Sequence, residues 1–220
     1  MQIMSRLSRL VSALLCASVI LGLLNACGVI AVGAVAGGAS VLADRRTAAA
    51  QATDIGIQLE AGAQLSNKFG NDAHINVSSF NQQVLLTGEV KTVAIKAQAE
   101  TDVKQIKNVR AVFNELIVGP NSSYTARAND AYVTSKIKAE MIFTNNLPSN
   151  SMDIVTEGTN VYMLGILTSA EAAMAKKIAS STNGVKAVYT FFDLISEADK
   201  ERIDAANKNA SATATKPTPQ

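Results

Sequence analysis

Residues 54–118 show a pattern of apolar and polar positions that predicts a helix, two strands, a second helix and a third strand. In the first helix, over residues 54–69, apolar side chains recur every four positions, as expected of one buried helix face. Those side chains are Ile57, Ala61, Leu65 and Phe69. Two strand-like runs follow, with a turn at Asn81-Gln82, and Thr92 can cap the second helix. An apolar strand over residues 109–118 closes the unit.

The same order of elements recurs between residues 130 and 195. The pattern predicts helix, strand, strand, helix and strand over residues 130–144, 153–156, 161–167, 169–181 and 185–195. In the later helix, the residues expected to face inward are Ala170, Met174 and Ile178. Each unit would bury one face of a three-stranded sheet under two helices, an α/β arrangement of the α+β two-layer type. Because units this small are marginal alone, we expect the two to pack on each other.

Short matches between the two units indicate a tandem duplication. Leu86-Thr87-Gly88-Glu89-Val90 and Leu164-Gly165-Ile166-Leu167 place a glycine at the same point of the same strand, just before the second helix. Residues 108–112 likewise match residues 184–188. We therefore expect tandem α-β-β-α-β domains. Their predicted bounds are 54–119 and 129–196, with a linker at 120–128.

The N-terminal residues have the three parts of an export signal. Arg6 and Arg9 give a basic start, an apolar run extends over residues 10–24, and the small Ala26 stands at the cleavage point. Cys27 follows directly, as in a bacterial lipobox, where the thiol is diacylated and becomes the new N-terminus. The alternative is a plain secretory signal with an incidental cysteine. Cys16 would leave with the signal peptide, residues 1–26, so the mature chain would keep no thiol for a disulfide.

Composition and local pattern assign the remaining segments. Loss of Arg6 and Arg9 with the signal would leave 18 basic residues against 18 acidic ones, so no overall positive field would attract nucleic acid. Residues 27–53 are expected to form a lipidated N-terminus and a linker. Their apolar, glycine-rich part, residues 28–43, is shorter than the roughly 20 residues that span a bilayer as a helix. Residues 197–220, rich in Ala, Thr, Lys and Pro towards the end, are expected to be a disordered tail.

The sequence offers few groups for catalysis. His74 is the single histidine and is interpreted as a solvated residue on a strand edge. Acidic residues are scattered, and their spacing proposes no carboxylate pair. We therefore expect no catalytic residues, no metal site and no cofactor.

Both repeats resemble BON domains, and the chain resembles the dual-BON outer-membrane lipoproteins of Gram-negative bacteria. The matching features are Cys27 with the glycine-rich stretch behind it, the strand ending Leu86-Thr87-Gly88, the helix start over residues 129–137 and the segment over residues 184–188. Gly28, where inner-membrane retention would favour Asp, resembles the outer-membrane sorting pattern. The resemblance implies a non-enzymatic protein, lipid-anchored in the outer membrane and facing the periplasm. It also implies binding of anionic phospholipid through the second BON domain, and support of outer-membrane integrity and protein assembly.

The first helix of the second unit carries the candidate lipid-binding residues. Its inward stripe is Val133, Ile137 and Met141. A second stripe begins one residue before the inward stripe and mixes aromatic and basic groups. Its members are Tyr132, Lys136, Ala139 and Phe143. An aromatic ring suits the headgroup boundary, and Lys136 and Lys138 would each gain roughly 1 kcal/mol near an anionic surface.

Two alternatives to lipid binding stay open. Tyr132 and Phe143 could pack against the first domain, or their face could recognise an outer-membrane assembly component or a cell-wall partner. The equivalent helix of the first unit turns Glu60, Gly62 and Gln64 outward and shows no such stripe. This difference between the two helices favours different roles for the two domains.

Overall fold

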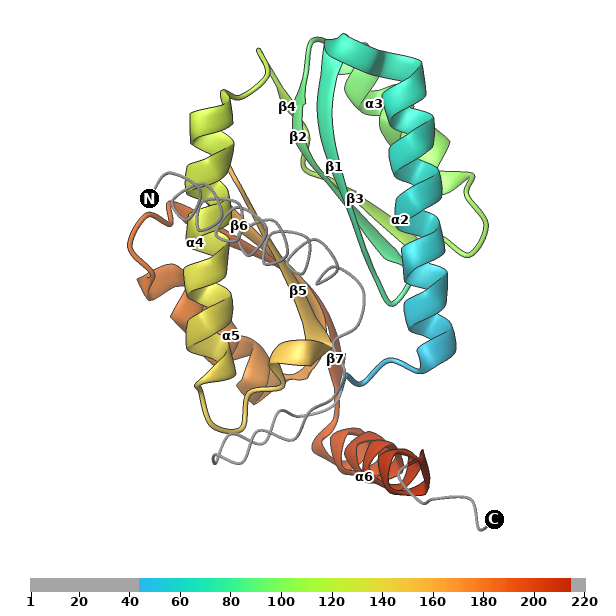
Figure 1. Ribbon diagram of the computed structural model, residues 1–220, viewed down its shortest axis with the longest axis vertical. Helices are drawn as coiled ribbons and strands as arrows, with labels where there is room; N and C mark the ends of the chain where they lie inside the picture. Colours follow the sequence, from blue (N-terminus) through green and yellow to red (C-terminus); the bar gives the residue numbers. More distant parts are fainter. Residues whose placement is uncertain (1–43, 215–220) are drawn as a thin grey trace, which may run out of the picture. The chain divides into compact units, whose positions relative to one another are not determined.

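A computed structural model of the chain describes residues 44–214, with side chains described through Asn207 (Figure 1). The predicted signal peptide at residues 1–26, the lipidation of Cys27, the glycine-rich stretch to residue 43 and the last six residues of the predicted tail lie outside this part. Among the residues described, no helix is both long enough and apolar enough to cross a membrane.

The first domain has the predicted α-β-β-α-β order, with its last strand in two pieces. Its elements are α2 (Ala48–Phe69), the 3-10 turn η1 (Gly70–Asp72), β1 (Ala73–Phe80), β2 (Gln83–Val90), α3 (Val93–Lys104), β3 (Ala111–Asn114) and β4 (Ile117–Val118). Central β2 pairs antiparallel with β1 and parallel with β3 and β4. The prediction of one strand over residues 109–118 was wrong. Asn114 breaks it, because its side-chain oxygen accepts the Leu116 N–H at 3.3 Å in place of a ladder bond.

The second domain repeats this order, which confirms the predicted tandem fold. Its elements are α4 (Tyr124–Ile142), the 3-10 turn η2 (Ser149–Ser151), β5 (Met152–Glu157), β6 (Asn160–Thr168), α5 (Ser169–Ser181) and β7 (Ala187–Ile195). Central β6 pairs antiparallel with β5 and parallel with β7. A further helix, α6 (Glu197–Ala214), follows the domain.

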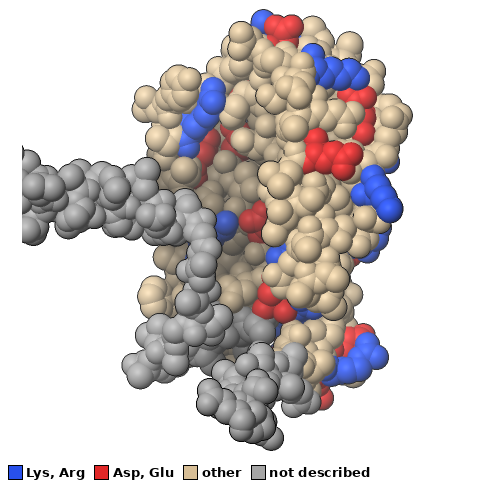
Figure 2. Space-filling model, turned by 45° about the vertical axis from the view of Figure 1, so that its right-hand side comes forward, with Lys and Arg blue, Asp and Glu red and all other residues tan. Residues whose placement is uncertain are grey.

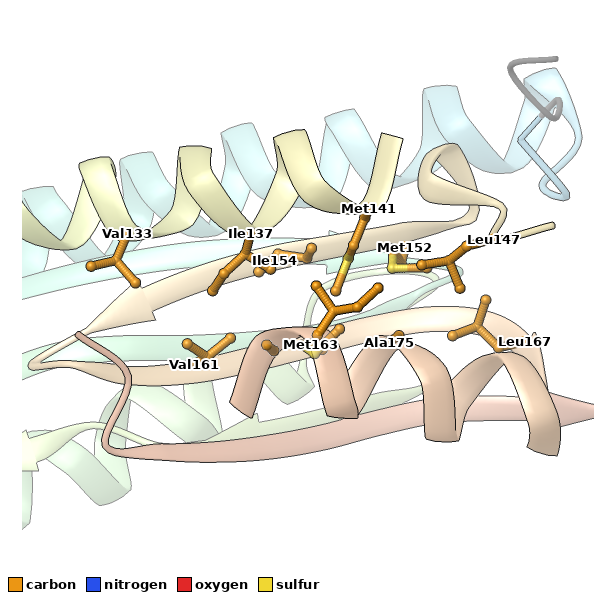
Figure 3. Close-up of a cluster of buried hydrophobic side chains, with 12 residues drawn as sticks. Val133, Ile137, Met141, Leu147, Met152, Ile154, Val161, Met163, Leu167 and Ala175 are labelled. Atoms are coloured by element: carbon orange, nitrogen blue, oxygen red, sulfur yellow. The ribbon is translucent and has the colours of Figure 1, made fainter. Parts of the chain in front are cut away.

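Each domain buries its core between two helices and one sheet face. In the second domain, Val133, Ile137 and Met141 of α4 point towards the strands, as the helical periodicity predicted (Figure 3). The inward face predicted for α5 was only partly right, since Ile178 is buried but Ala170 and Met174 are exposed. The residues that α5 buries are Glu171, Ala175, Ile178 and Ala179. A capping box between Thr168 and Glu171 sets this phase and turns Glu171 inward.

Both first helices begin before their predicted starts at residues 54 and 130. The Thr47 hydroxyl accepts the Ala50 N–H, and the Ser123 hydroxyl accepts the Ala126 N–H, so each caps its helix. Alanine-rich residues behind each cap favour the helical state. Much of the predicted linkers at 44–53 and 120–128 is therefore helical.

The prediction of a disordered tail from residue 197 was wrong for residues 197–214, which form α6. The Ser196 hydroxyl accepts the Asp199 N–H at 3.0 Å, which caps the helix. Asp204 lies 3.2 Å from the guanidinium of Arg45. Buried Arg45 also makes two hydrogen bonds to Glu171, at 2.7 and 2.9 Å, so it joins α5 to α6.

A buried aspartate supports the hairpin turn of each domain. Asn81 and Gln82 in the first turn, and Gly158 and Thr159 in the second, all have positive φ, as a two-residue type I′ turn requires. The Asn81 and Gln82 N–H groups donate to Asp54 at 2.8 and 2.7 Å, and the Gly158 and Thr159 N–H groups donate to Asp130 at 2.9 and 3.0 Å. The two helices thus hold the two turns by equivalent contacts, and the sequence pattern did not indicate this.

The helix-free faces of the two sheets form a third apolar cluster. Its buried members come from both domains: Phe80, Leu85, Tyr162, Leu164 and Ile166. Phe113 and Phe191 stack there with ring centroids 4.3 Å apart. Asp193 of β7 accepts hydrogen bonds from Asn81 at 2.8 Å and Gln83 at 2.9 Å. These contacts agree with the expectation that the two small units pack on each other.

Candidate functional site

The candidate stripe on α4 lies outside the core. Tyr132 is 62% exposed and Phe143 is 80% exposed, while Ala139 is exposed and Lys136 is half-buried. The alternative in which both aromatic rings pack against the first domain is therefore wrong for this structure. These four residues share one helix face because they lie three, four, seven or eleven positions apart.

Lys136 is held beside the Tyr132 ring. Its ammonium nitrogen lies 5.6 Å from the ring centroid, a cation–π distance, and donates to the Asn183 carbonyl oxygen at 3.3 Å. The positive charge therefore stands at the rim of an exposed aromatic surface.

Lys138 lies on a different side of α4. Six residues after Tyr132, it stands roughly 120° away around the helix at 3.6 residues per turn. Its ammonium lies 3.4 Å from the Asp153 carboxylate, and it borders a cavity of about 440 Å³ that Met141 and Ile142 also line. The structure thus brings together four of the five predicted residues and separates the fifth.

Two exposed residues on α4 belong to the same surface and were missed by the sequence analysis. Tyr124 is 87% exposed and Ile142 is 49% exposed. They are 18 residues apart, which is five helical turns, so they lie in line along the helix. Tyr124 was missed because it precedes the predicted helix start, although the capping residue Ser123 could have signalled that start.

The exposed residues of α4 form an uncharged arc with a lysine at each border. We call this surface the α4 arc; it is defined by Tyr124, Ala128, Ala131, Tyr132, Ser135, Ala139, Ile142 and Phe143. At 3.6 residues per turn these side chains cover roughly 120°. Lys136 follows at one border and Lys138 at the other. An apolar arc flanked by lysines is typical of helices that lie in a membrane interface.

Helix α2 of the first domain exposes apolar residues too. Ile55 and Leu59 are exposed, and they line a groove of about 340 Å³ with Ile75 and Val77. The prediction for this helix was the absence of a stripe of mixed aromatic and basic groups; the exposed pair on α2 is aliphatic and contains no aromatic ring.

His74 is not the solvated residue that the sequence suggested. It is partly buried, and its Nδ1 lies 3.0 Å from Glu89 Oε2. Glu157 reaches the same place from β5 and accepts a hydrogen bond from Asn76 at 2.7 Å. Burial raises the pKa of Glu157, and the nearby negative charge of Glu89 raises it further. Spacing along the chain could not reveal this cluster, because Glu89 and Glu157 come from different domains.

Charged residues do not gather into a field of one sign on the surface shown in Figure 2, where acidic and basic side chains are interspersed. Attraction of an anionic partner to this face would therefore arise from local groups of basic residues.

Comparisons with known proteins agree with the fold. The chain is 29% identical over 171 residues to "Outer membrane lipoprotein DolP" of Haemophilus influenzae, covering 77% of this chain and 89% of that protein. It is 26% identical over 147 residues to "21 kDa hemolysin" of Actinobacillus pleuropneumoniae, covering 66% and 76%. It is also 30% identical over 117 residues to "Osmotically-inducible protein Y" of Escherichia coli, covering 52% and 58%.

The family model described as BON domain matches this chain twice, at residues 48–120 and 129–195. The first match begins with α2 and ends just after β4, and the second runs from within α4 to the end of β7. The chain therefore belongs to the BON domain family and carries two copies of the domain.

Proposed function

We propose that this protein is a non-enzymatic outer-membrane lipoprotein that binds anionic phospholipid through the α4 arc of its second BON domain and supports outer-membrane integrity. Similarity to a protein named as an outer membrane lipoprotein supports the location. Cys27, behind its lipobox-like sequence, would carry the acyl chains, and the two domains would face the periplasm. Two or more acyl chains anchor a protein stably, whereas a single chain binds only marginally.

The observation that carries this proposal is the exposure of Tyr132 and Phe143 beside Lys136. Large aromatic side chains exposed on one helix face keep apolar surface in contact with water, which is unfavourable unless a partner covers it. A phospholipid interface supplies such cover, because rings settle at the headgroup level while lysines reach the phosphates. The anchor would keep the domains near this surface, so a weak contact by α4 would be sufficient.

The exposed aliphatic stripe of α2 favours a second candidate function, that of a protein-interaction adaptor. Ile55 and Leu59 border a groove but have no basic residue between them on that face. An apolar groove without positive charge suits an apolar protein segment better than an anionic lipid. In this alternative the protein would recognise a component of outer-membrane protein assembly or a cell-wall protein.

Flotation with liposomes tests the lipid proposal. A soluble chain from Asp44 to Gln220, which retains the contact of α6 with Arg45, would be mixed with anionic or zwitterionic vesicles. We expect binding to anionic vesicles that weakens with added salt, because exposed charges are screened over about 8–10 Å at physiological ionic strength. A Tyr132→Ser, Phe143→Ser double variant should lose this binding.

The matched controls change equivalent residues away from the α4 arc. Lys107→Gln removes an exposed lysine from the first domain, and Ile55→Ser, Leu59→Ser removes the apolar stripe of α2. Both controls should bind vesicles as well as the unaltered chain. If the unaltered chain floats with neither vesicle, the lipid proposal fails. Loss of a protein partner in the α2 variant alone would then favour the adaptor.

A further inference from the structure

A histidine and two glutamates converge where β1, β2 and β5 meet. One potential ligand atom from each of His74, Glu89 and Glu157 lies within 4.8 Å of the others. His74 and Glu89 are directly opposite residues of the antiparallel β1–β2 pair, so their side chains leave the sheet on the same side. Glu157 is the last residue of β5, in the other domain.

The surrounding structure orients these groups. Asn76, two residues after His74 on β1, donates to Glu157 Oε2 at 2.7 Å. The Ser122 N–H donates to Glu89 Oε2 at 3.1 Å, beside the His74 contact. Such outer hydrogen bonds hold side chains in place around metal ions in proteins.

Glu157 supplies the feature that points to a ligand. It is only 4% exposed, yet among the residues described no donor other than Asn76 is bonded to its carboxylate. A buried carboxylate ordinarily needs an opposite charge or several donors. Glu157 and His74 also border a cavity of about 400 Å³, which gives an ion a route from solvent and room for a water ligand.

We infer that His74, Glu89 and Glu157 form a binding site for a divalent transition-metal ion, with zinc as the best match. Zinc takes one imidazole nitrogen and carboxylate oxygens at about 2.0–2.2 Å, commonly in a tetrahedron whose ligand atoms are roughly 3.4 Å apart. The His74 and Glu89 ligand atoms are 3.0 Å apart and all three lie within 4.8 Å of one another, so side-chain rotations would complete the arrangement. A mixed set of imidazole and carboxylates favours zinc over calcium or magnesium, which prefer oxygen ligands alone.

The ion would join the two BON domains. Two ligands come from the β1–β2 hairpin of the first domain and one comes from β5 of the second. Because bound metal stabilises only the state that holds all of its ligands, zinc would strengthen the contact between the domains.

Zinc binding by the full chain in detergent tests this inference. The protein would carry no histidine tag, because His74 is the chain's single histidine. Metal would be stripped with a chelator, and zinc affinity measured by competition with a chromophoric chelator, with magnesium in a parallel titration. We expect one zinc per chain and a shift of the single set of imidazole nitrogen signals in the NMR spectrum.

Isosteric variants identify the ligands. Glu157→Gln and His74→Gln should each weaken zinc binding at least tenfold and abolish the zinc-dependent rise in thermal unfolding temperature. Glu140→Gln, which changes an exposed glutamate of α4, should bind zinc as the unaltered chain does. If His74→Gln does not fold, Glu157→Gln still decides the matter. The absence of saturable binding at one zinc per chain, or undiminished binding by Glu157→Gln, would overturn the site.

Discussion

Asp130→Ala is expected to destabilise the second BON domain by about 3–5 kcal/mol, through two hydrogen bonds to a hairpin turn. The Asp130 side chain lies on α4 with the residue only 4% exposed, and it accepts the N–H groups of Gly158 and Thr159 at 2.9 and 3.0 Å. A hydrogen bond to a charged group contributes about 1.5–3 kcal/mol, so the pair contributes about 3–6 kcal/mol. Alanine removes the free-energy cost of burying a charged carboxylate. This offsets part of the lost contribution and gives the stated range.

Urea denaturation of the chain from Asp44 to Gln220, followed by circular dichroism, measures the effect. Asp130→Asn keeps the side-chain volume and one acceptor oxygen, so we expect about half the loss. Glu140→Ala, an exposed position on the same helix, should change the free energy of unfolding by less than about 0.5 kcal/mol. A loss below about 1 kcal/mol for Asp130→Ala would refute the reasoning, because the turn would then hold without its carboxylate.

Three further predictions concern the close approach of paired strands within each sheet and the buried ion pair of Arg45 and Glu171. Gly88→Ala should destabilise the chain more than Gly165→Ala in paired urea denaturations. Gly88 has a φ of +110°, and a Cβ added there would lie 2.0 Å from a backbone oxygen. A Cβ added at Gly165 would lie 2.9 Å from its nearest neighbours. Arg45→Ala should cost up to about 3–5 kcal/mol in the same assay, since the buried carboxylate of Glu171 loses both guanidinium hydrogen bonds and keeps the more distant Lys200 ammonium, 3.4 Å away, and the Thr168 N–H. Burial opposes ionisation of Glu171, but the hydrogen bonds from Arg45 and the Thr168 N–H, together with the charges of Arg45 and Lys200, outweigh it and lower the pKa of Glu171 below its ordinary 4.5. The pair therefore stabilises the fold above pH 4.5 and loses this effect as the pH falls, so Glu171→Gln should flatten the acid side of a plot of unfolding free energy against pH.

Local patterns in the sequence were sufficient to predict the order of helices and strands. The four-residue spacing from Ile57 to Leu65 matches the buried face of α2, and Thr92 caps α3 as predicted. The turn at Asn81-Gln82 was also found, because two strand-like runs flank it. These features depend on residues that are neighbours in the chain, so periodicity alone detects them.

The sequence pattern did not reveal charged residues that are buried by distant partners. Arg45 was assigned to a linker, yet it binds Glu171, 126 residues later. A lone charged residue in a sequence is expected to be solvated, since burial is tolerated only when the fold supplies a partner. For the same reason, the buried contacts of Asp54, Asp130 and His74 were not predicted. The inward face of α5 was only partly predicted for a different reason: this face is mostly alanine, so the apolar periodicity was too weak to fix the inward side.

The α4 arc leads to a last prediction, which concerns how the helix would lie on a membrane. If only Tyr132 and Phe143 enter the headgroups, Lys136 lies near the phosphates. Lys138 then lies away from them, because it stands roughly 120° around the helix from Tyr132. If the whole arc from Tyr124 to Phe143 lies flat, both lysines border the membrane and contribute about equally, at roughly 1 kcal/mol each.

The packing of the domains favours the flat orientation. The helix-free sheet faces meet each other, so the helices of both domains lie on the opposite sheet faces. Tyr124 and Ile142 are exposed at the two ends of α4, so the arc is uncovered over its length of about 28 Å. We therefore expect Lys136→Gln and Lys138→Gln each to weaken binding to anionic vesicles about fivefold, and the double variant about 25-fold. A loss confined to Lys136→Gln would show that the helix is tilted onto its aromatic edge, because the attraction of a lysine falls off within a Debye length of the surface.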